Sequence, residues 1–150
     1  MIHRIDARII GHLRSWEMPL GRLAIFIVYF WFGLLKLMGT SPATPMVQAL
    51  FEKTIQFMPF PIFYALFSLF EVVIGILFLI RGLERVAIFL LGLHLLTTVL
   101  PLILLPGMTW EGFLTPTLEG QYIIKNILIA ALAVVIGARL IPMSAKNVNN

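Results

Sequence analysis

The chain has no cysteine among its 150 residues, and this absence removes several kinds of chemistry at once. Without a thiol, the chain forms no disulfide, performs no thiol–disulfide exchange and offers no thiolate to iron–sulfur clusters or other metals. Charge is scarce as well, at 12% of residues, whereas 60% are hydrophobic. A soluble domain has about 25% charged residues, so the composition indicates a membrane protein.

Several motifs are also absent. The chain carries no Walker loop, no dinucleotide-binding glycine motif and no His-Glu-x-x-His pair. Only His94 lies within a long apolar run, so one chain cannot supply two axial histidines to a haem. A metal site would need Glu71 and His94 plus an unusual third ligand, so no metal is expected. The arginines behind the net charge of +4 flank apolar runs, which indicates membrane topology and no nucleic-acid partner.

Four long apolar runs divide the chain. They cover about residues 20–38, 59–80, 84–105 and 121–141. Each is close to the ~20 residues that cross a ~30 Å hydrocarbon core as a helix. Because lipid offers no partner to free backbone groups, the runs must be helical. The sequence therefore predicts an all-α integral membrane four-helix bundle, one domain over 1–150 that ends in a short polar tail, 142–150.

Two segments outside these runs have helical periodicity. Residues 1–19 carry one apolar face, formed by Ile2, Ile5, Ile9, Leu13 and Trp16, and a basic remainder with Arg4, Arg8 and Arg14. This pattern is typical of a helix lying in the headgroup plane, and a disordered basic tail is the alternative. In residues 45–57, apolar side chains also recur at helical spacing on one face, and polar side chains lie on the other. The pattern predicts a short helix that lies on the outer membrane surface or caps the bundle.

Basic residues predict the orientation. Eight of the eleven would lie on one side: Arg4, Arg8, Arg14, Arg22, Arg81, Arg85, Arg139 and Lys146. Positive loops stay in the cytoplasm, so both termini should be cytoplasmic and loops 39–58 and 106–120 external. The expected location is a bacterial inner membrane, crossed several times.

Two ionisable residues lie deep inside the runs and are the candidate catalytic residues. Glu71 is near mid-bilayer, where a charge costs ~2.5–3.5 kcal/mol and therefore needs an interior partner. His94 is central in the third run. Tyr64, Ser68 and Gly75 share the helical face of Glu71. The face of His94 carries Thr97, Thr98 and Pro101, and the proline should free the Thr97 carbonyl and kink that helix.

The first and fourth runs carry polar stripes too. Tyr29, Gly33 and Lys36 share one face of the first run, and the fourth opens with Gln121, Tyr122, Lys125 and Asn126. Antiparallel packing of these stripes predicts one polar cavity that opens outward. Its candidate ligand-binding residues are Lys36, Lys125, Tyr64, Thr98, Gln121 and Asn126. An apolar lining is expected from Phe26, Phe32, Phe67 and Phe78.

Structural explanations compete with this site. Lys36 and Lys125 can extend to the outer interface, as long basic side chains do near span ends. Glu71 can be paired only to hold helix register, and His94 can be a packing residue. Thr97 and Thr98 can bond to their own helix backbone.

Short motifs carry a family resemblance. They are Gly-Leu-Leu-Lys (Gly33 to Lys36), Leu-Phe-Glu-Val-Val-Ile-Gly (Leu69 to Gly75), Gly-Leu-Glu-Arg (Gly82 to Arg85) and the segment Thr117 to Asn126. Together with the four-span layout, over roughly residues 20–141, they resemble the DoxX-like family of small membrane proteins. The resemblance implies quinone-linked oxidation of sulfur compounds, a role in oxidative-stress complexes, or a protein without known activity.

The leading hypothesis is an accessory or small subunit of a redox system that binds a lipophilic ligand, a quinone, in the outer half of the bundle. A small transporter or proton pathway through Glu71 and His94 is one alternative, and a non-catalytic assembly partner is another. The lipid bilayer is an expected partner. The sequence leaves open a redox or other membrane-protein partner, self-association, and whether the protein is an enzyme.

The topology yields the first testable prediction. Single cysteines report cleanly because the native chain has none. A cysteine at Glu111 should react with a membrane-impermeant maleimide from outside intact cells, and one at Arg81 only after the membrane is opened. Labelling of the Glu111 position only from the cytoplasmic side would reverse the orientation.

Overall fold

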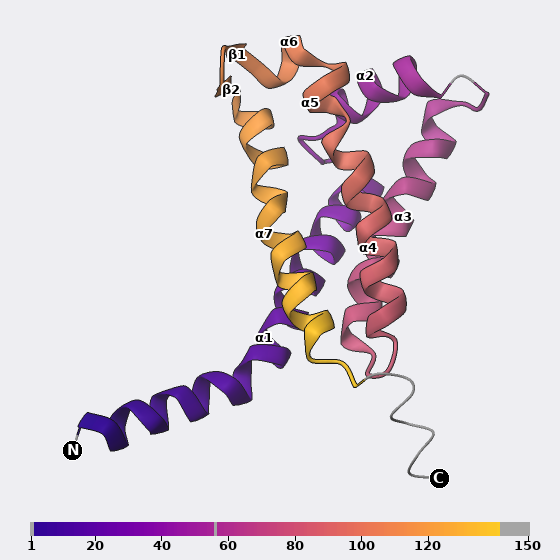
Figure 1. Cartoon of the computed structure of the whole chain (residues 1–150). Coiled ribbons are helices and arrows are strands. Elements are labelled where there is room, and N and C mark those ends of the chain that lie inside the picture. Colours follow the sequence, from indigo (N-terminus) through magenta and orange to yellow (C-terminus); the bar gives the residue numbers. More distant parts are fainter. Residues whose placement is uncertain (1, 56, 142–150) are drawn as a thin grey trace.

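The computed structural model describes residues 2–55 and 57–141, and most of them are helical (Figure 1). The predicted tail 142–150, with Lys146, lies outside the described residues, as do Met1 and Gln56. In chain order the elements are α1 (Ile2–Leu37), α2 (Thr44–Thr54), α3 (Phe60–Leu79), α4 (Glu84–Val99), α5 (Pro101–Leu104), α6 (Pro106–Thr109), β1 (Trp110–Gly112), β2 (Thr115–Pro116) and α7 (Leu118–Ala138).

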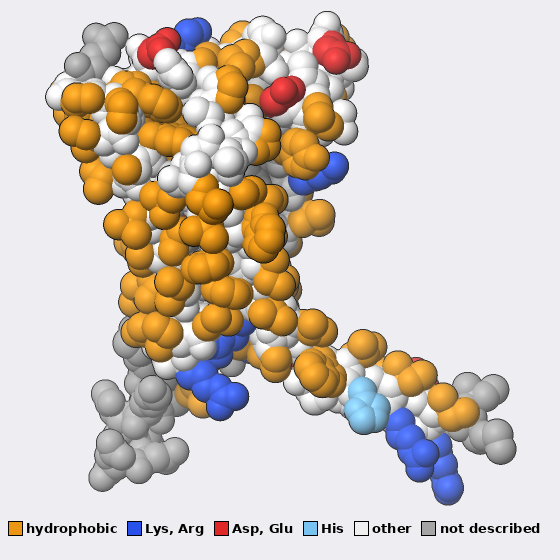
Figure 2. Space-filling view, turned by 180° about the vertical axis from the view of Figure 1, so that it is seen from behind, with side chains coloured by type: hydrophobic (Ala, Val, Ile, Leu, Met, Phe, Trp, Pro, Cys, Tyr) orange, Lys and Arg blue, Asp and Glu red, His pale blue; other side chains and the backbone are white. Residues whose placement is uncertain are grey.

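Four helices are long and apolar enough to cross a membrane, which confirms the predicted fold class and shows a multi-pass membrane protein. They are His3–Leu37, Phe60–Leu79, Glu84–Leu104 and Leu118–Ala138. Figure 2 shows hydrophobic side chains around the middle of the molecule and charged side chains toward its two ends. The end with α2, α5 and α6 is called the α2 end below, and the end with the 81–83 turn is called the turn end.

α1 is longer than predicted, because the amphipathic segment and the first span form one helix of 36 residues. Pro19 lies inside it, and the part before the proline leaves the bundle as an arm (Figure 1). Proline removes one backbone hydrogen bond, which bends a helix without ending it. Leu13 and Trp16 on the arm are 65% and 59% exposed. Because α1 starts at Ile2, this segment is a helix, and the alternative of a disordered tail is wrong.

The α2 end is more ordered than expected. α2 overlaps the predicted 45–57 helix but starts one residue earlier and ends three residues earlier, and the loop predicted at 106–120 contains α6 and the antiparallel β1–β2 hairpin. Thr117 caps α7 by accepting a hydrogen bond from the Gly120 backbone at 3.1 Å. This cap starts the last span at Leu118, three residues before the predicted 121.

α1 and α3 cross in close backbone contact at two glycines. A Cβ on Gly33 would lie 2.8 Å from Val72 Cγ2 and 2.9 Å from the Ser68 carbonyl oxygen. A Cβ on Gly75 would lie 2.9 Å from the Phe30 backbone nitrogen. Small residues at such crossings let membrane helices approach each other closely. This crossing sets the distance between the polar faces of the two helices.

An apolar core fills the half of the bundle toward the turn end. All four spanning helices contribute to it, through Ile25, Tyr29, Ile74, Phe78, Ala87, Leu91, Ala133 and Ile136. Ile74 and Phe78 lie one and two turns beyond Glu71 on α3, and Leu91 and Ala87 lie one and two turns before His94 on α4. The core therefore separates these two polar residues from the turn end.

The glycine crossing predicts an asymmetric response to added methyl groups. Gly33→Ala should lower the free energy of unfolding by about 1–3 kcal/mol, because its Cβ would overlap α3. Gly92→Ala is the matched control, since no atom lies within 4 Å of its Cβ position. It should be neutral or stabilising by about 0.5–1 kcal/mol through helix propensity. Equal effects of the two substitutions on unfolding in detergent would contradict the close crossing.

Candidate functional site

Glu71 is at the centre of the candidate site. Its Oε2 accepts a hydrogen bond from Lys36 Nζ at 2.7 Å, and its Oε1 lies 3.0 Å from His94 Nε2. The three side chains come from α1, α3 and α4, and all are buried. In a low-dielectric interior the ammonium compensates the carboxylate charge, which meets the requirement that a charge at this depth has a partner.

Tyr29 extends the contact on the far side of the imidazole. Its hydroxyl lies 3.1 Å from His94 Nδ1, and its ring meets the imidazole edge-on at a centroid distance of 5.1 Å. An ionised carboxylate only accepts hydrogen bonds, so Nε2 must donate to Glu71 and carry the ring proton. In the neutral imidazole Nδ1 is then the acceptor, and the Tyr29 hydroxyl donates to it. Lys36, Glu71, His94 and Tyr29 are called the buried polar chain below.

Phe67 lies between two members of this chain. Its ring stacks on the His94 imidazole at 5.1 Å with an interplanar angle of 22°, and Lys36 Nζ is 6.0 Å from its centroid. The other expected lining residues lie elsewhere. Phe78 belongs to the apolar core, Phe26 stacks on its helix neighbour Phe30, and Phe32 is 52% exposed. Of the four phenylalanines, Phe67 contacts the site.

The predicted contribution of α7 to this cluster is wrong for Lys125 and Gln121. Both side chains are exposed, and Lys125 Nζ lies 5.3 Å from the centroid of the Tyr122 ring. The cause is the rotation of the helix. Ile123 faces inward and is buried, and two residues along a helix correspond to a rotation of about 200°, so the residues on either side of it point outward.

The remaining candidate residues make contacts away from the buried polar chain. Asn126 Nδ2 donates to Thr98 Oγ1 at 3.4 Å and thereby joins α7 to α4. The Tyr64 hydroxyl bonds to Thr44 Oγ1 at 2.6 Å, which joins α3 to α2. The hydroxyls of Thr97 and Thr98 also donate to backbone carbonyls three residues earlier. Both therefore bond to their own helix backbone, the structural alternative considered for them. At Pro101, where a kink was predicted, the structure ends α4 at Val99 and starts α5 at the proline.

A second buried ion pair was missed by the sequence reasoning. Arg22 Nη1 lies 2.9 Å from Glu84 Oε1, and its Nε donates to the Phe78 carbonyl at 2.6 Å. The other Glu84 oxygen accepts from the Gly82 backbone at 2.7 Å. The sequence did contain a signal for this pair, because Arg22 and Glu84 carry opposite charges and lie at the same membrane end of their spans. The pair joins α1 to α4 at the turn end.

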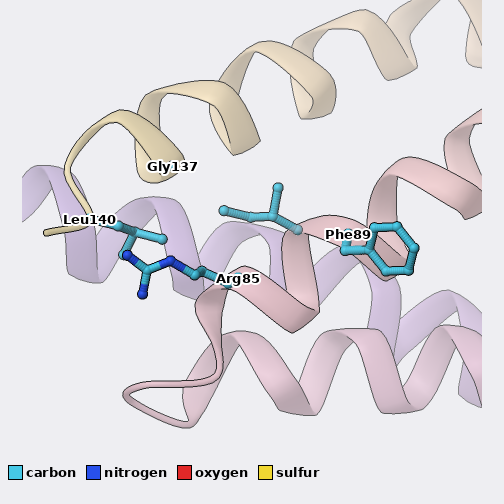
Figure 3. A pocket seen from close by; sticks show the side chains of 5 residues that line it. Arg85, Phe89, Gly137 and Leu140 are labelled. Carbon is cyan, nitrogen blue, oxygen red and sulfur yellow. The ribbon is translucent and has the colours of Figure 1, made fainter. Parts of the chain in front are cut away.

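A shallow cleft lies at the turn end, between α4 and α7 (Figure 3). It has a volume of about 420 Å³ and is lined by Arg85, Ile88, Phe89, Gly137 and Leu140. None of the residues predicted to bind a ligand lines this cleft. It is therefore a different feature from the outward-opening cavity expected beside Glu71.

The fold and the site define a class: a multi-pass membrane protein whose bundle encloses a lysine–glutamate pair extended by a histidine and a tyrosine. Comparison of the chain with protein-family models, curated proteins and solved structures found no match. Among residues 2–55 and 57–141, no group of three or more histidine, cysteine, aspartate or glutamate side chains is placed to hold a metal ion.

The buried pair predicts strong coupling between its two members. Lys36→Met should cost about 3–5 kcal/mol of unfolding free energy, because it leaves the Glu71 carboxylate unpaired in the bundle. The double variant Lys36→Met/Glu71→Gln should recover most of this loss, since no uncompensated charge remains. Arg139→Met is the control: it breaks the exposed ion pair with Glu17 and should cost less than about 1 kcal/mol. Additive losses in the double variant would contradict the coupling.

Proposed function

We propose that the chain is a DoxX-like protein of the bacterial inner membrane, with both termini and the turn end in the cytoplasm. The positive-inside rule supports this orientation. The motifs behind the resemblance also supply residues that make the main interhelical contacts. Gly33 lies in the close crossing, Lys36 and Glu71 form the buried pair, and Glu84 pairs with Arg22.

We further propose that the protein binds a lipophilic quinone beside the buried polar chain and serves as an accessory or small subunit of a redox system. The observation that carries this proposal is the continuous hydrogen-bonded line of Lys36, Glu71, His94 and Tyr29 inside the membrane. Ionisable groups within spans are rare, because lipid disfavours them, and they mark ligand or proton sites.

The donor chemistry of these residues fits the two carbonyl oxygens of a quinone. Lys36 has three N–H donors and uses one of them on Glu71, so further donors remain for a ligand oxygen. On the other side, His94 and Tyr29 already use their single N–H and O–H on Glu71 and His94, so a second ligand oxygen would bind there by displacing one of these hydrogen bonds. Phe67 offers a flat apolar face between Lys36 and His94, suited to stacking with another ring. When bound, a quinone supplies the two-electron, two-proton chemistry.

The residues of the chain itself are arranged to move a proton. The two nitrogens of His94 face different partners, so the imidazole can accept a proton at Nδ1 and release one from Nε2 to Glu71. Lys36 would stabilise negative charge that develops on a neighbouring oxygen. These steps need no water inside the bundle, because each donor already lies within hydrogen-bonding distance of its acceptor.

The apolar core favours a one-sided site over the alternative of a transmembrane proton pathway. Between Glu71 and the Arg22–Glu84 pair lie Ile74, Phe78 and Leu91, which carry no group that can relay a proton and are fully buried. A through-pathway would require this packing to open. Exchange with the α2 side leaves this core intact and requires only that the cover formed by α2 and its buried Phe51 is displaced.

The quinone proposal predicts co-extraction. Protein purified in mild detergent should retain quinone, and Glu71→Gln and His94→Ala should each reduce the retained amount at least severalfold, because each removes a member of the buried polar chain. Lipid extraction followed by chromatography of the extract measures this. Glu111→Gln and His12→Ala are matched controls at exposed positions and should retain the native amount.

Two outcomes would redirect the proposal. If the pure protein contains no quinone, and added quinone neither binds nor raises its thermal stability, the redox role is wrong. Proton-coupled uptake into vesicles that depends on Glu71 would then favour transport. Neither activity, together with intact folding, would favour an assembly role.

A further inference from the structure

A row of aromatic rings leads from the surface helix α2 to the buried histidine. Phe51 on α2 lies 4.9 Å from Phe63, Phe63 lies 5.7 Å from Phe67, and Phe67 lies 5.1 Å from the His94 ring, all between centroids. The Phe63–Phe67 and Phe67–His94 rings stack at interplanar angles of 16° and 22°, whereas Phe51 is tilted by 35° to Phe63. These four residues are called the aromatic ladder.

The ladder has the properties of a passage wall for a flat molecule. Offset stacking at such distances is favourable for aromatic rings, and each step offers a face similar to the last. Phe63 and Phe67 are only half-buried, whereas Phe51 at the α2 end is 7% exposed although it belongs to a surface helix. Phe51 is packed against both Phe60 and Phe63, and it therefore closes the α2 end of the row.

α2 is held over this end by one hydrogen bond at each of its ends. Thr44 at its start bonds to the Tyr64 hydroxyl, and Lys53 at its end donates to the Leu104 carbonyl at 2.8 Å. The Lys53 bond is exposed, so breaking it exchanges one hydrogen bond for another with water. Figure 1 shows α2 lying across the α2 end, beside α5 and above α3. α2 is thus attached at both of its ends, and its Phe51 ring packs between them against α3.

We propose that α2 is a lid whose displacement admits a planar, lipophilic ring along the aromatic ladder to His94. The ring class rests on the quinone function proposed above, whereas the lid rests on the contacts of α2 alone. Access then occurs from the side of α2, which agrees with the closed apolar core toward the turn end. For the passage to open, Phe51 has to leave its packing position against Phe60 and Phe63.

A cysteine reporter tests the lid without any quinone. Phe67→Cys places the chain's only thiol on the ladder, and its reaction rate with N-ethylmaleimide measures how often the passage opens. Adding Lys53→Met should raise that rate about fivefold, the effect expected from losing one hydrogen bond of the closed state. Lys125→Met in the same Phe67→Cys background is the control and should leave the rate unchanged. Phe63→Cys replaces the reporter if the first variant does not fold.

The outcomes separate the two proposals. An unchanged rate with Lys53→Met overturns the lid, even if the purified protein binds quinone. A raised rate supports the lid. Protection of the thiol by an added short-chain benzoquinone with a fully substituted ring supports the ring passage, provided that the protein mass shows no quinone added to the thiol. A raised rate in a protein that binds no benzoquinone keeps the lid and overturns both the ring class and the quinone function.

Discussion

Glu71 lies at a depth where lipid provides no water, and the arrangement of α1, α3 and α4 depends on how its charge is compensated. The compensating ammonium reaches it only because α1 and α3 touch at Gly33 and Gly75. A side chain at either glycine would hold the helices apart and lengthen a pair that now lies at 2.7 Å. The helix crossing and the ion pair are therefore one structural unit: packing sets the geometry, and the charges make that geometry specific.

The same constraint organises the polar groups around Glu71. One carboxylate oxygen is taken by Lys36, and the other selects the tautomer of His94, which in turn receives the Tyr29 hydroxyl. In all the residues that the structure describes, no fully buried side-chain nitrogen or oxygen lacks a hydrogen-bond partner. A satisfied network of this kind is rigid in the closed state. A ligand would thus have to compete at donors already in place, mainly the remaining N–H groups of Lys36.

The two ends of the bundle are closed by different kinds of interaction. The turn end is closed by the buried Arg22–Glu84 pair and by an apolar core with fully buried side chains, which are costly to open. The α2 end is closed by a short helix held through one exposed and one partly buried hydrogen bond and by one buried phenylalanine. Because of this difference, a ligand would reach the site more easily from the α2 end than from the turn end. The difference is the structural reason to prefer binding from one side over passage through the bundle.

Local properties of the sequence determined the class of the protein, its four spans, a disturbance of the helix at Pro101 and the burial of Glu71 and His94. Hydropathy and the depth of a charge within a span can be judged without knowing which residues will be neighbours in the fold. Only the tertiary structure decided which faces meet. Spans that are apolar on nearly every side do not encode their rotation, so the outward position of Lys125 beside a buried Ile123 could not be read from spacing. The pairing of Arg22 with Glu84 and the ladder from Phe51 to His94 join residues far apart in the chain, and such contacts exist only once the helices have packed.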